Sequence, residues 1–312
     1  MTGDLGSPLV GHQVDIQWSG YAPGGPPSMC RAHHRPLLEE HVTRRWIVGT
    51  AIAATAVAAV ALTAAVAQAA EARDYVVLGD SYASGLGAGS YRDQTCLQSD
   101  GYSYPARWVA KKGRAAFGDS IVNRSCSGAT VTTVSTKQLG NLDAETGWVT
   151  ITVGGNDIGF TSTLTTCVLG TDANCATAVQ AGLGKATTSL PGALDRLFAT
   201  IRSKAPNAKV YVVGYPRLVT TSATPVGNCM LSTYERQQLN HSADVLAEVI
   251  RQRTAAKSGF TFVDGRSIFS GHEACTAAPW INRPGTGSLN EAFHPNRTGY
   301  EQYANRLQQI TG

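Results

Sequence analysis

Four short stretches of this chain combine glycine with polar side chains that can act as nucleophile, proton acceptor or hydrogen-bond donor. Together these types match what acyl transfer from an ester requires: a nucleophile, a base within reach of it, and preorganised donors for the oxyanion. Each stretch alone is equally compatible with a turn or a helix cap, so the prediction depends on their meeting at one place. The stretches are Gly79-Asp80-Ser81, Ser127-Gly128-Ala129, Gly154-Gly155-Asn156-Asp157 and Phe293-His294-Pro295-Asn296.

The first stretch directly follows Tyr75–Leu78, an apolar run rich in β-branched residues. Such short runs, bounded by turn residues, are typical of buried strands. Gly79 lets the chain turn sharply as it leaves the sheet, and Ser81 is then expected at the carboxyl end of a strand, where open α/β sheets place their ligand sites. If a helix begins there, its N-terminal N–H groups would face an anion formed at Ser81.

The second and third stretches also follow predicted strands, and strands and helices alternate along the rest of the chain. This alternation indicates a parallel sheet covered on both faces. We therefore expect residues 70–312 to form one catalytic domain, a three-layer α/β/α sandwich with a five-stranded parallel sheet. The later strands are expected at 120–123, 148–153, 209–213 and 260–263, and the helices at 104–112, 131–139, 176–204 (interrupted near Pro191), 233–255 and 299–310, with a loop holding Cys167 and Cys175.

The first 69 residues have a different character. Residues 1–41 hold prolines, glycines and histidines without a sustained apolar period, and we expect a disordered extension or a stretch upstream of a true start at Val42. Arg44 and Arg45 precede an uncharged run that ends near Ala67-Gln68-Ala69, a small-x-small pattern. Residues 42–69 are thus predicted to be a secretory signal peptide, exported by the general or the twin-arginine route. An uncleaved membrane anchor is the alternative.

Composition narrows the classes of function. The net charge of +4 is modest and unclustered, which gives no reason to expect a nucleic-acid partner. Few histidines and no Cys-x-x-Cys pair argue against a metal site, and no cofactor is expected.

Six of the seven cysteines lie in the predicted domain, and an even number in an exported chain implies disulfides. Many pairings exist in principle. We favour Cys96–Cys126, Cys167–Cys175 and Cys229–Cys275, because each pair brackets a loop region between predicted elements.

The four stretches, in this order, resemble the SGNH (GDSL-type) hydrolases, and in particular the secreted actinomycete lipases and esterases. The resemblance covers roughly residues 74–312. It implies a flavodoxin-like sheet, sequential disulfides, Ser81 as nucleophile and His294 as base. It further implies an oxyanion hole formed by the N–H groups of Ser81 and Gly128 and the side chain of Asn156. His241, in a predicted helix, and His272, near Cys275, are expected to be structural, with His272 as the reserve base.

The sequence departs from the family's pattern at one position. The family usually has aspartate three residues before the histidine, and here Glu291 stands there. Either Glu291 orients His294, or a backbone carbonyl does so and leaves a Ser–His dyad. An orienting partner sets the imidazole tautomer.

We therefore expect a secreted, monomeric serine ester hydrolase, a lipase or carboxylesterase that cleaves acyl esters such as acylglycerols and contacts lipid interfaces transiently. A phospholipase or lysophospholipase and a glycan O-deacetylase are alternatives with the same chemistry. A non-catalytic secreted binding protein is an alternative of a different class.

Overall fold

The computed structural model describes residues 74–227, 229–285 and 288–312. The expectations for residues 1–41 and for the signal peptide at residues 42–69 lie outside the described residues, as does Cys30. Among the described residues, no helix is long and apolar enough to cross a bilayer.

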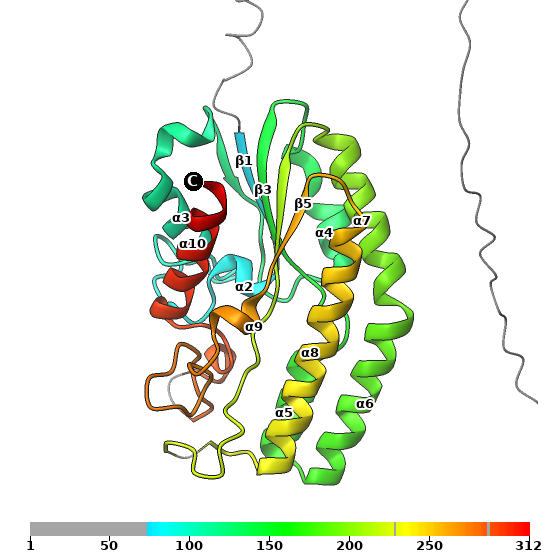
Figure 1. Ribbon diagram of the computed structural model, residues 1–312, viewed down its shortest axis with the longest axis vertical. Coiled ribbons are helices and arrows are strands. Elements are labelled where there is room, and N and C mark those ends of the chain that lie inside the picture. Colours follow the sequence, from blue (N-terminus) through cyan, green and yellow to red (C-terminus); the bar gives the residue numbers. More distant parts are fainter. Residues whose placement is uncertain (1–73, 228, 286–287) are drawn as a thin grey trace, which may run out of the picture. The chain divides into compact units, whose positions relative to one another are not determined.

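Five parallel strands form one sheet in the order β2-β1-β3-β4-β5 (Figure 1). Because the order is that of flavodoxin-like doubly wound folds, the expected fold class is confirmed. All strands point their carboxyl ends to one edge, which brings the residues that follow β1, β2 and β3 together. The strands are β1 (Asp74–Gly79), β2 (Ile121–Asn123), β3 (Thr146–Thr152), β4 (Lys209–Val213) and β5 (Phe260–Val263).

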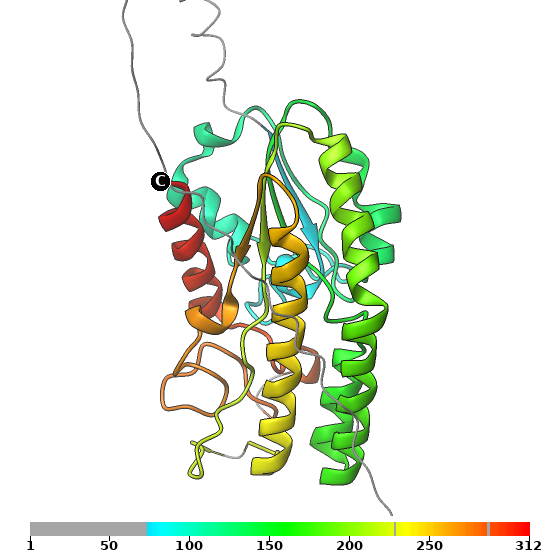
Figure 2. The ribbon, with the colours of Figure 1, turned by 45° about the vertical axis from the view of Figure 1, so that its right-hand side comes forward.

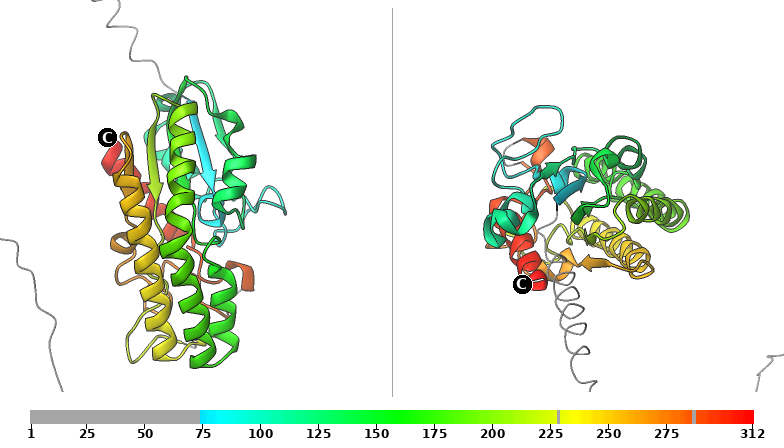
Figure 3. Two further views of the ribbon diagram at one scale, coloured as in Figure 1. Left: turned by 90° about the vertical axis from the view of Figure 1, so that its right-hand side faces the viewer. Right: turned by 90° about the horizontal axis from the view of Figure 1, so that it is seen from above.

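Helices cover both faces of the sheet (Figures 1 and 3). On one face lie α3 (Tyr104–Lys112) and α10 (Arg297–Thr311), which pack against each other, and on the other lie α4 (Val131–Lys137), α7 (Leu190–Lys204) and α8 (Thr233–Ala255). Helix α6 (Asp172–Thr188) packs against α7 and α8. The described elements also include the short helices α2 (Ser81–Ser84) and α9 (Gly265–Ile268) and the 3-10 turns Arg114–Phe117, Leu139–Asn141 and Leu289–Glu291.

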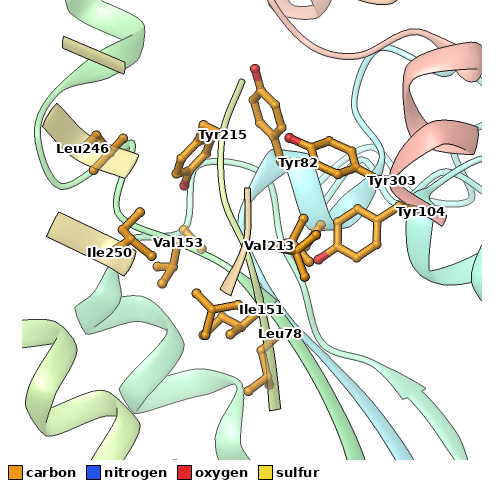
Figure 4. Packing of buried hydrophobic residues seen from close by; sticks show 14 of the residues in the cluster. Leu78, Tyr82, Tyr104, Ile151, Val153, Val213, Tyr215, Leu246, Ile250 and Tyr303 are labelled. Atoms are coloured by element: carbon orange, nitrogen blue, oxygen red, sulfur yellow. The ribbon is translucent and has the colours of Figure 1, made fainter. Parts of the chain in front are cut away.

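The side chains of the three central strands, β1, β3 and β4, are mostly buried on both faces of the sheet. Leu78 and Ile151 of neighbouring strands are fully buried, and Figure 4 shows Leu246 and Ile250 of α8 on one side and Tyr104 and Tyr303 on the other. Fully burying one leucine or isoleucine side chain stabilises a fold by about 1.5–3 kcal/mol. Because apolar contacts reach the sheet from both sides, the strand ends that carry the candidate site have a rigid base.

One expectation for the region after β3 is wrong. The segment expected as a loop contains helix α5 (Phe160–Leu169), which runs away from the sheet edge (Figures 1 and 2). It was missed because its threonines are β-branched and disfavour helices. Packing on α6 overrides this weak preference. The predicted interruption near Pro191 is confirmed, since α6 ends at Thr188 and Pro191 lies in the first turn of α7.

The three favoured disulfides are confirmed: Cys96–Cys126, Cys167–Cys175 and Cys229–Cys275. Two of them reach the candidate site. The first holds the loop after β2, where the Ser127 N–H also donates to the Cys96 carbonyl at 3.0 Å. The second joins α5 to α6.

Candidate active site

Ser81 lies in the strand–turn–helix arrangement predicted from the sequence. Gly79 ends β1 with φ 122°, and a Cβ there would lie 2.2 Å from the Thr152 carbonyl oxygen of β3, so only glycine fits. The Asp80 carboxylate caps α2 by accepting from the Tyr82 N–H at 3.0 Å. Ser81, at the first turn of α2, is 9% exposed and opens into a cavity.

The buried side chain of Gln138 holds the end of β1 in place. Its amide oxygen accepts from the Gly79 N–H at 2.7 Å, and its amide nitrogen donates to the Gly79 carbonyl at 2.9 Å. Strand β2 pairs with β1 only as far as Val77. The Gln138 amide thus holds Gly79 on the side of β1 that faces β2, where the Cys126 N–H also donates to the Gly79 carbonyl at 3.0 Å.

Ser81 and His294 are directly hydrogen-bonded although 213 residues separate them. Ser81 Oγ lies 2.8 Å from His294 Nε2, and His294 Nδ1 lies 3.1 Å from the Ala292 carbonyl oxygen. Since a carbonyl only accepts, the ring carries its proton on Nδ1 and leaves Nε2 free to accept from the serine hydroxyl. Burial lowers the pKa of His294 to about 4, although the Ala292 carbonyl acts in the opposite direction. The imidazole is therefore neutral at pH 7.

Of the two alternatives for orienting His294, the structure has the backbone carbonyl. The Glu291 carboxylate instead accepts a hydrogen bond from the Tyr91 hydroxyl, which in turn accepts from the N–H groups of Gly87 (2.9 Å) and Gly89 (3.3 Å). Glu291 meets His294 only through the backbone, where the His294 N–H donates to the Glu291 carbonyl at 3.2 Å. The carboxylate is engaged elsewhere and does not orient the imidazole.

The loop carrying His294 is held from several sides. The Tyr82 hydroxyl donates to the Phe293 carbonyl at 2.7 Å, and the rings of Tyr82 and His294 lie 5.2 Å apart. The Asn282 N–H donates to the His294 carbonyl at 2.9 Å. Phe293 has φ 61°, a conformation that a bulky residue keeps only when its surroundings enforce it. These contacts fix the imidazole against Ser81.

Hydrogen-bond donors stand beside the serine. Ser81, Gly128 and Asn156 all line the same cavity as His294. The described residues offer no acceptor to the backbone N–H of Ser81 or of Gly128. The Asn156 amide donates to the Ala129 carbonyl at 3.0 Å, which occupies one of its two hydrogens. The four predicted stretches therefore meet, with donors left for an anion formed near Ser81 Oγ.

Two carboxylates, one fully buried and one partly buried, lie close to these donors. Asp80 is fully buried, which raises its pKa to about 7 although hydrogen bonds from Tyr215 and Tyr82 oppose the shift. Burial also raises the pKa of Asp157, whose carboxylate accepts from the Val131 N–H at the start of α4 (3.0 Å). That position suits an anion because of the helix dipole.

The sequence did not identify Gln138, Tyr82 or Tyr215 as parts of the site. Tyr215 lies two residues after the end of β4, at the same sheet edge as Ser81. That placement was the signal available in the sequence. Among the described residues, the two other histidines do not line this cavity. His241 is exposed on α8, and His272 stacks on Trp280 while its Nδ1 lies 2.7 Å from the Ala278 carbonyl oxygen.

The cavity has a volume of about 530 Å³ and one strongly apolar side. Phe160, Leu164 and Val168, spaced four residues apart on α5, line that side together with Thr161 and Thr165, and Leu169 extends it outward with 75% of its side chain exposed. Residues four apart lie on one face of a helix. Pro284, Ala292 and Phe293 also line the cavity.

Comparisons with known proteins agree with this geometry. Residues 77–302 match the model of the GDSL-like lipase/acylhydrolase family. Lipase 1 of Streptomyces coelicolor is 41% identical over 232 residues, which cover 74% of this chain and 83% of that protein. The lipase of Streptomyces rimosus is 40% identical, with 73% and 83% covered.

Two solved structures are similar over nearly their whole length. Phospholipase A1 from Streptomyces albidoflavus NA297 is 38% identical with a TM-score of 0.71, covering 76% of this chain and 99% of that one. An extracellular lipase from Streptomyces rimosus is 38% identical with a TM-score of 0.70, covering 77% and 100%. The expected class, an ester hydrolase, is confirmed, and this chain belongs to the GDSL-like lipase/acylhydrolase family.

Proposed function

We propose that this protein hydrolyses acyl esters of lipids through a Ser81–His294 dyad. The single observation that carries the proposal is the 2.8 Å contact between Ser81 Oγ and a neutral imidazole, beside unoccupied N–H donors. His294 Nε2 takes the hydroxyl proton as Ser81 Oγ attacks the ester carbonyl. The Ser81 and Gly128 N–H groups and the Asn156 amide stabilise the oxyanion. The protonated imidazole then delivers its proton to the leaving alcohol.

Water completes the turnover. His294 removes a proton from a water molecule, the hydroxide attacks the acyl-serine carbonyl, and the acid leaves as Ser81 regains its proton. The Ala292 carbonyl accepts from Nδ1–H throughout, so it supports the imidazolium without a carboxylate. This contact supports a dyad rather than a triad through Glu291.

The cavity favours a lipid acyl chain as the substrate. Its α5 side presents apolar surface well beyond what an acetyl group would fill, which disfavours glycan O-deacetylation. The relatives named above include lipases and a phospholipase A1, so acylglycerols and phospholipids are both candidate substrates. A non-catalytic binding role is disfavoured, because binding alone does not require a serine hydroxyl aligned with a histidine.

We further propose that the protein is secreted and acts as a monomer at lipid surfaces. Three disulfides persist in oxidising compartments, and one similar structure is that of an extracellular lipase. The C-terminal end of α5 and the N-terminal end of α8 lie at the same end of the domain (Figures 1 and 2), and they carry the exposed apolar side chains of Leu169 and Tyr234. Leu169→Ser should reduce vesicle-bound phospholipid hydrolysis severalfold without changing turnover of a soluble short ester.

The experiment that tests the function is hydrolysis of a chain-length series of p-nitrophenyl esters by residues 70–312, with Ser81→Ala as the control. We expect activity that rises from acetyl to medium or long chains and disappears in Ser81→Ala. Parallel assays with triacylglycerol and phosphatidylcholine divide lipase from phospholipase. A folded wild-type protein that hydrolyses none of these esters would refute the proposal.

A further inference from the structure

We propose that Tyr215 is a positioning residue, whose hydroxyl ties the turn that carries the nucleophile to the loop that carries Asn156. The inference rests on the proposed function and goes beyond it, because it concerns how donors from two different strands keep a fixed spacing. Tyr215 itself contacts no reacting atom in the proposed reaction. It acts through Asp80 and Gly155, the residues directly before Ser81 and Asn156.

The hydroxyl of Tyr215 forms a bridge between two loops. It donates to Asp80 Oδ2 and accepts from the Gly155 N–H at 3.0 Å. Asp80 lies after β1 and Gly155 after β3, so three segments far apart in the sequence meet at one oxygen atom. Both hydrogen bonds are buried, which strengthens them and makes the loss of either costly.

The packing leaves the ring of Tyr215 little freedom. Its exposed fraction is 4%, and a Cβ at Gly155 would lie 3.2 Å from its ring. The ring also packs edge-on against Tyr82 at 5.0 Å, and Tyr82 holds the His294 loop. The Tyr303 hydroxyl fixes the preceding residue by donating to the Gly214 carbonyl at 2.7 Å. The bridge is thus rigid, and its two ends move together.

The bridge also satisfies the buried carboxylate of Asp80. Oδ1 accepts from the Tyr82 N–H at 3.0 Å, and Oδ2 accepts from Tyr215. Burial raises the pKa of Asp80, and the hydrogen bond from Tyr215 opposes this rise. Removing the hydroxyl therefore deprives two buried groups of a partner at once: Oδ2 of Asp80 and the N–H of Gly155.

This geometry has a consequence for the oxyanion hole. The Ser81 N–H follows β1, while the Asn156 amide follows β3, and the oxyanion needs both at hydrogen-bonding distance. Without the bridge, the Gly155 N–H must find another acceptor and the Asn156 loop shifts. A misplacement of about 1 Å can cost on the order of 10²-fold in rate.

The experiment compares Tyr215→Phe with Tyr75→Phe in the disulfide-bonded protein, using a soluble p-nitrophenyl ester. Tyr75 is a matched control, because it is fully buried and its hydroxyl also makes a hydrogen bond, 2.6 Å from Thr150 Oγ1, away from the cavity. We expect kcat to fall about 10- to 100-fold in Tyr215→Phe with KM within about twofold. Tyr75→Phe should keep wild-type kcat even where its melting temperature falls equally.

A double-mutant cycle with Asn156→Ala asks whether Tyr215 acts through the oxyanion hole. We expect Tyr215→Phe to have little further effect once Asn156 is removed. Wild-type kcat in Tyr215→Phe, or a full and additive loss in the double variant, would overturn the inference.

Two further variants cover the cases in which Tyr215→Phe does not fold or the proposed function is wrong. If Tyr215→Phe does not fold, Asp80→Asn serves instead. The new amide oxygen still accepts from the Tyr82 N–H, but the NH2 group can only donate, so the Tyr215 hydroxyl proton loses its acceptor and the Tyr215 oxygen faces two donors. The same kcat loss and the same non-additivity with Asn156→Ala are expected, and additivity would again overturn the inference. Full ester hydrolysis by Ser81→Ala would instead refute the proposed function itself.

Discussion

The two sides of the cavity are built in opposite ways. The floor, at the carboxyl ends of β1 and β3, consists of buried polar groups whose hydrogen bonds are nearly all satisfied within the protein. The wall, helix α5, presents apolar side chains and ends in the exposed Leu169. Catalysis and substrate choice therefore depend on different parts of the cavity. Hydrogen bonds at the sheet edge govern catalysis, and the shape of the α5 side governs which substrate binds.

The floor tolerates little change because each polar group has one geometry that satisfies it. Gln138 makes two hydrogen bonds to the backbone of Gly79, and Asp80 and Tyr215 each bridge two partners in the buried interior. The wall depends on apolar contact, which is not directional. The Cys167–Cys175 disulfide joins its far end to α6, so the wall is fixed as well as apolar. Substitutions on the two sides should therefore have different signatures.

The largest effect is expected on the floor. His294→Ala removes the base, and we expect kcat for a soluble ester to fall by at least about 10³-fold. His241→Ala is the control, because His241 is an exposed residue on α8, and it should leave kcat unchanged. The measurement is steady-state hydrolysis with the fold checked by circular dichroism. A His294→Ala enzyme within tenfold of wild type would show that another group removes the proton.

The second-largest effect is the loss of activity at low pH. Burial lowers the pKa of His294 to about 4, and only the neutral imidazole can accept the serine proton. Activity should therefore persist at pH 5 and fall about tenfold per pH unit below about 4. The measurement is kcat/KM for a soluble ester against pH. An acid limb near the ordinary histidine value of 6.5, or near 7 where Asp80 titrates, would contradict this assignment.

A substitution in the α5 wall should change the enzyme's preference for acyl-chain length. Leu164→Trp fills the cavity next to Phe160, and we expect kcat/KM for long acyl esters to fall roughly 10-fold or more, with acetyl and butyryl esters nearly unaffected. Ser162→Ala, on the exposed side of α5, is the matched control. The chain-length profile is the measurement. An equal loss on all chain lengths would mean that the wall also supports the chemistry.

The smallest effect is expected at Glu291. Because its carboxylate pairs with Tyr91 while the Ala292 carbonyl orients the imidazole, Glu291→Gln should reduce kcat by less than about tenfold. The measurement is kcat for the same soluble ester. A loss close to that of His294→Ala would restore the triad and refute the dyad.

Much of the floor could be predicted from the sequence. A β-branched run ending in glycine predicts both the strand and the turn at Ser81, and parallel strands necessarily bring their carboxyl ends together. What the local pattern does not contain is the partner of a buried polar group. Tyr215 reaches Asp80 across 135 residues and Gln138 reaches Gly79 across 59, so packing of distant segments decides these contacts.

Two further features escaped prediction for physical reasons. Helix α5 is hidden by threonines with weak helix propensity, although Phe160, Leu164 and Val168 recur at helical spacing. The choice between Glu291 and the Ala292 carbonyl depends on the path of one short loop, including the positive φ of Phe293. Sequence spacing allowed both arrangements.

The most direct test of the Ser81–His294 dyad is intact-mass analysis after reaction with a fluorophosphonate, followed by peptide mapping. We expect one phosphonyl adduct per molecule, located on Ser81. The adduct should form at a similar rate in Glu291→Gln and at least about 10²-fold more slowly in His294→Ala. An adduct on another residue, or labelling of Ser81 that does not depend on His294, would contradict the dyad.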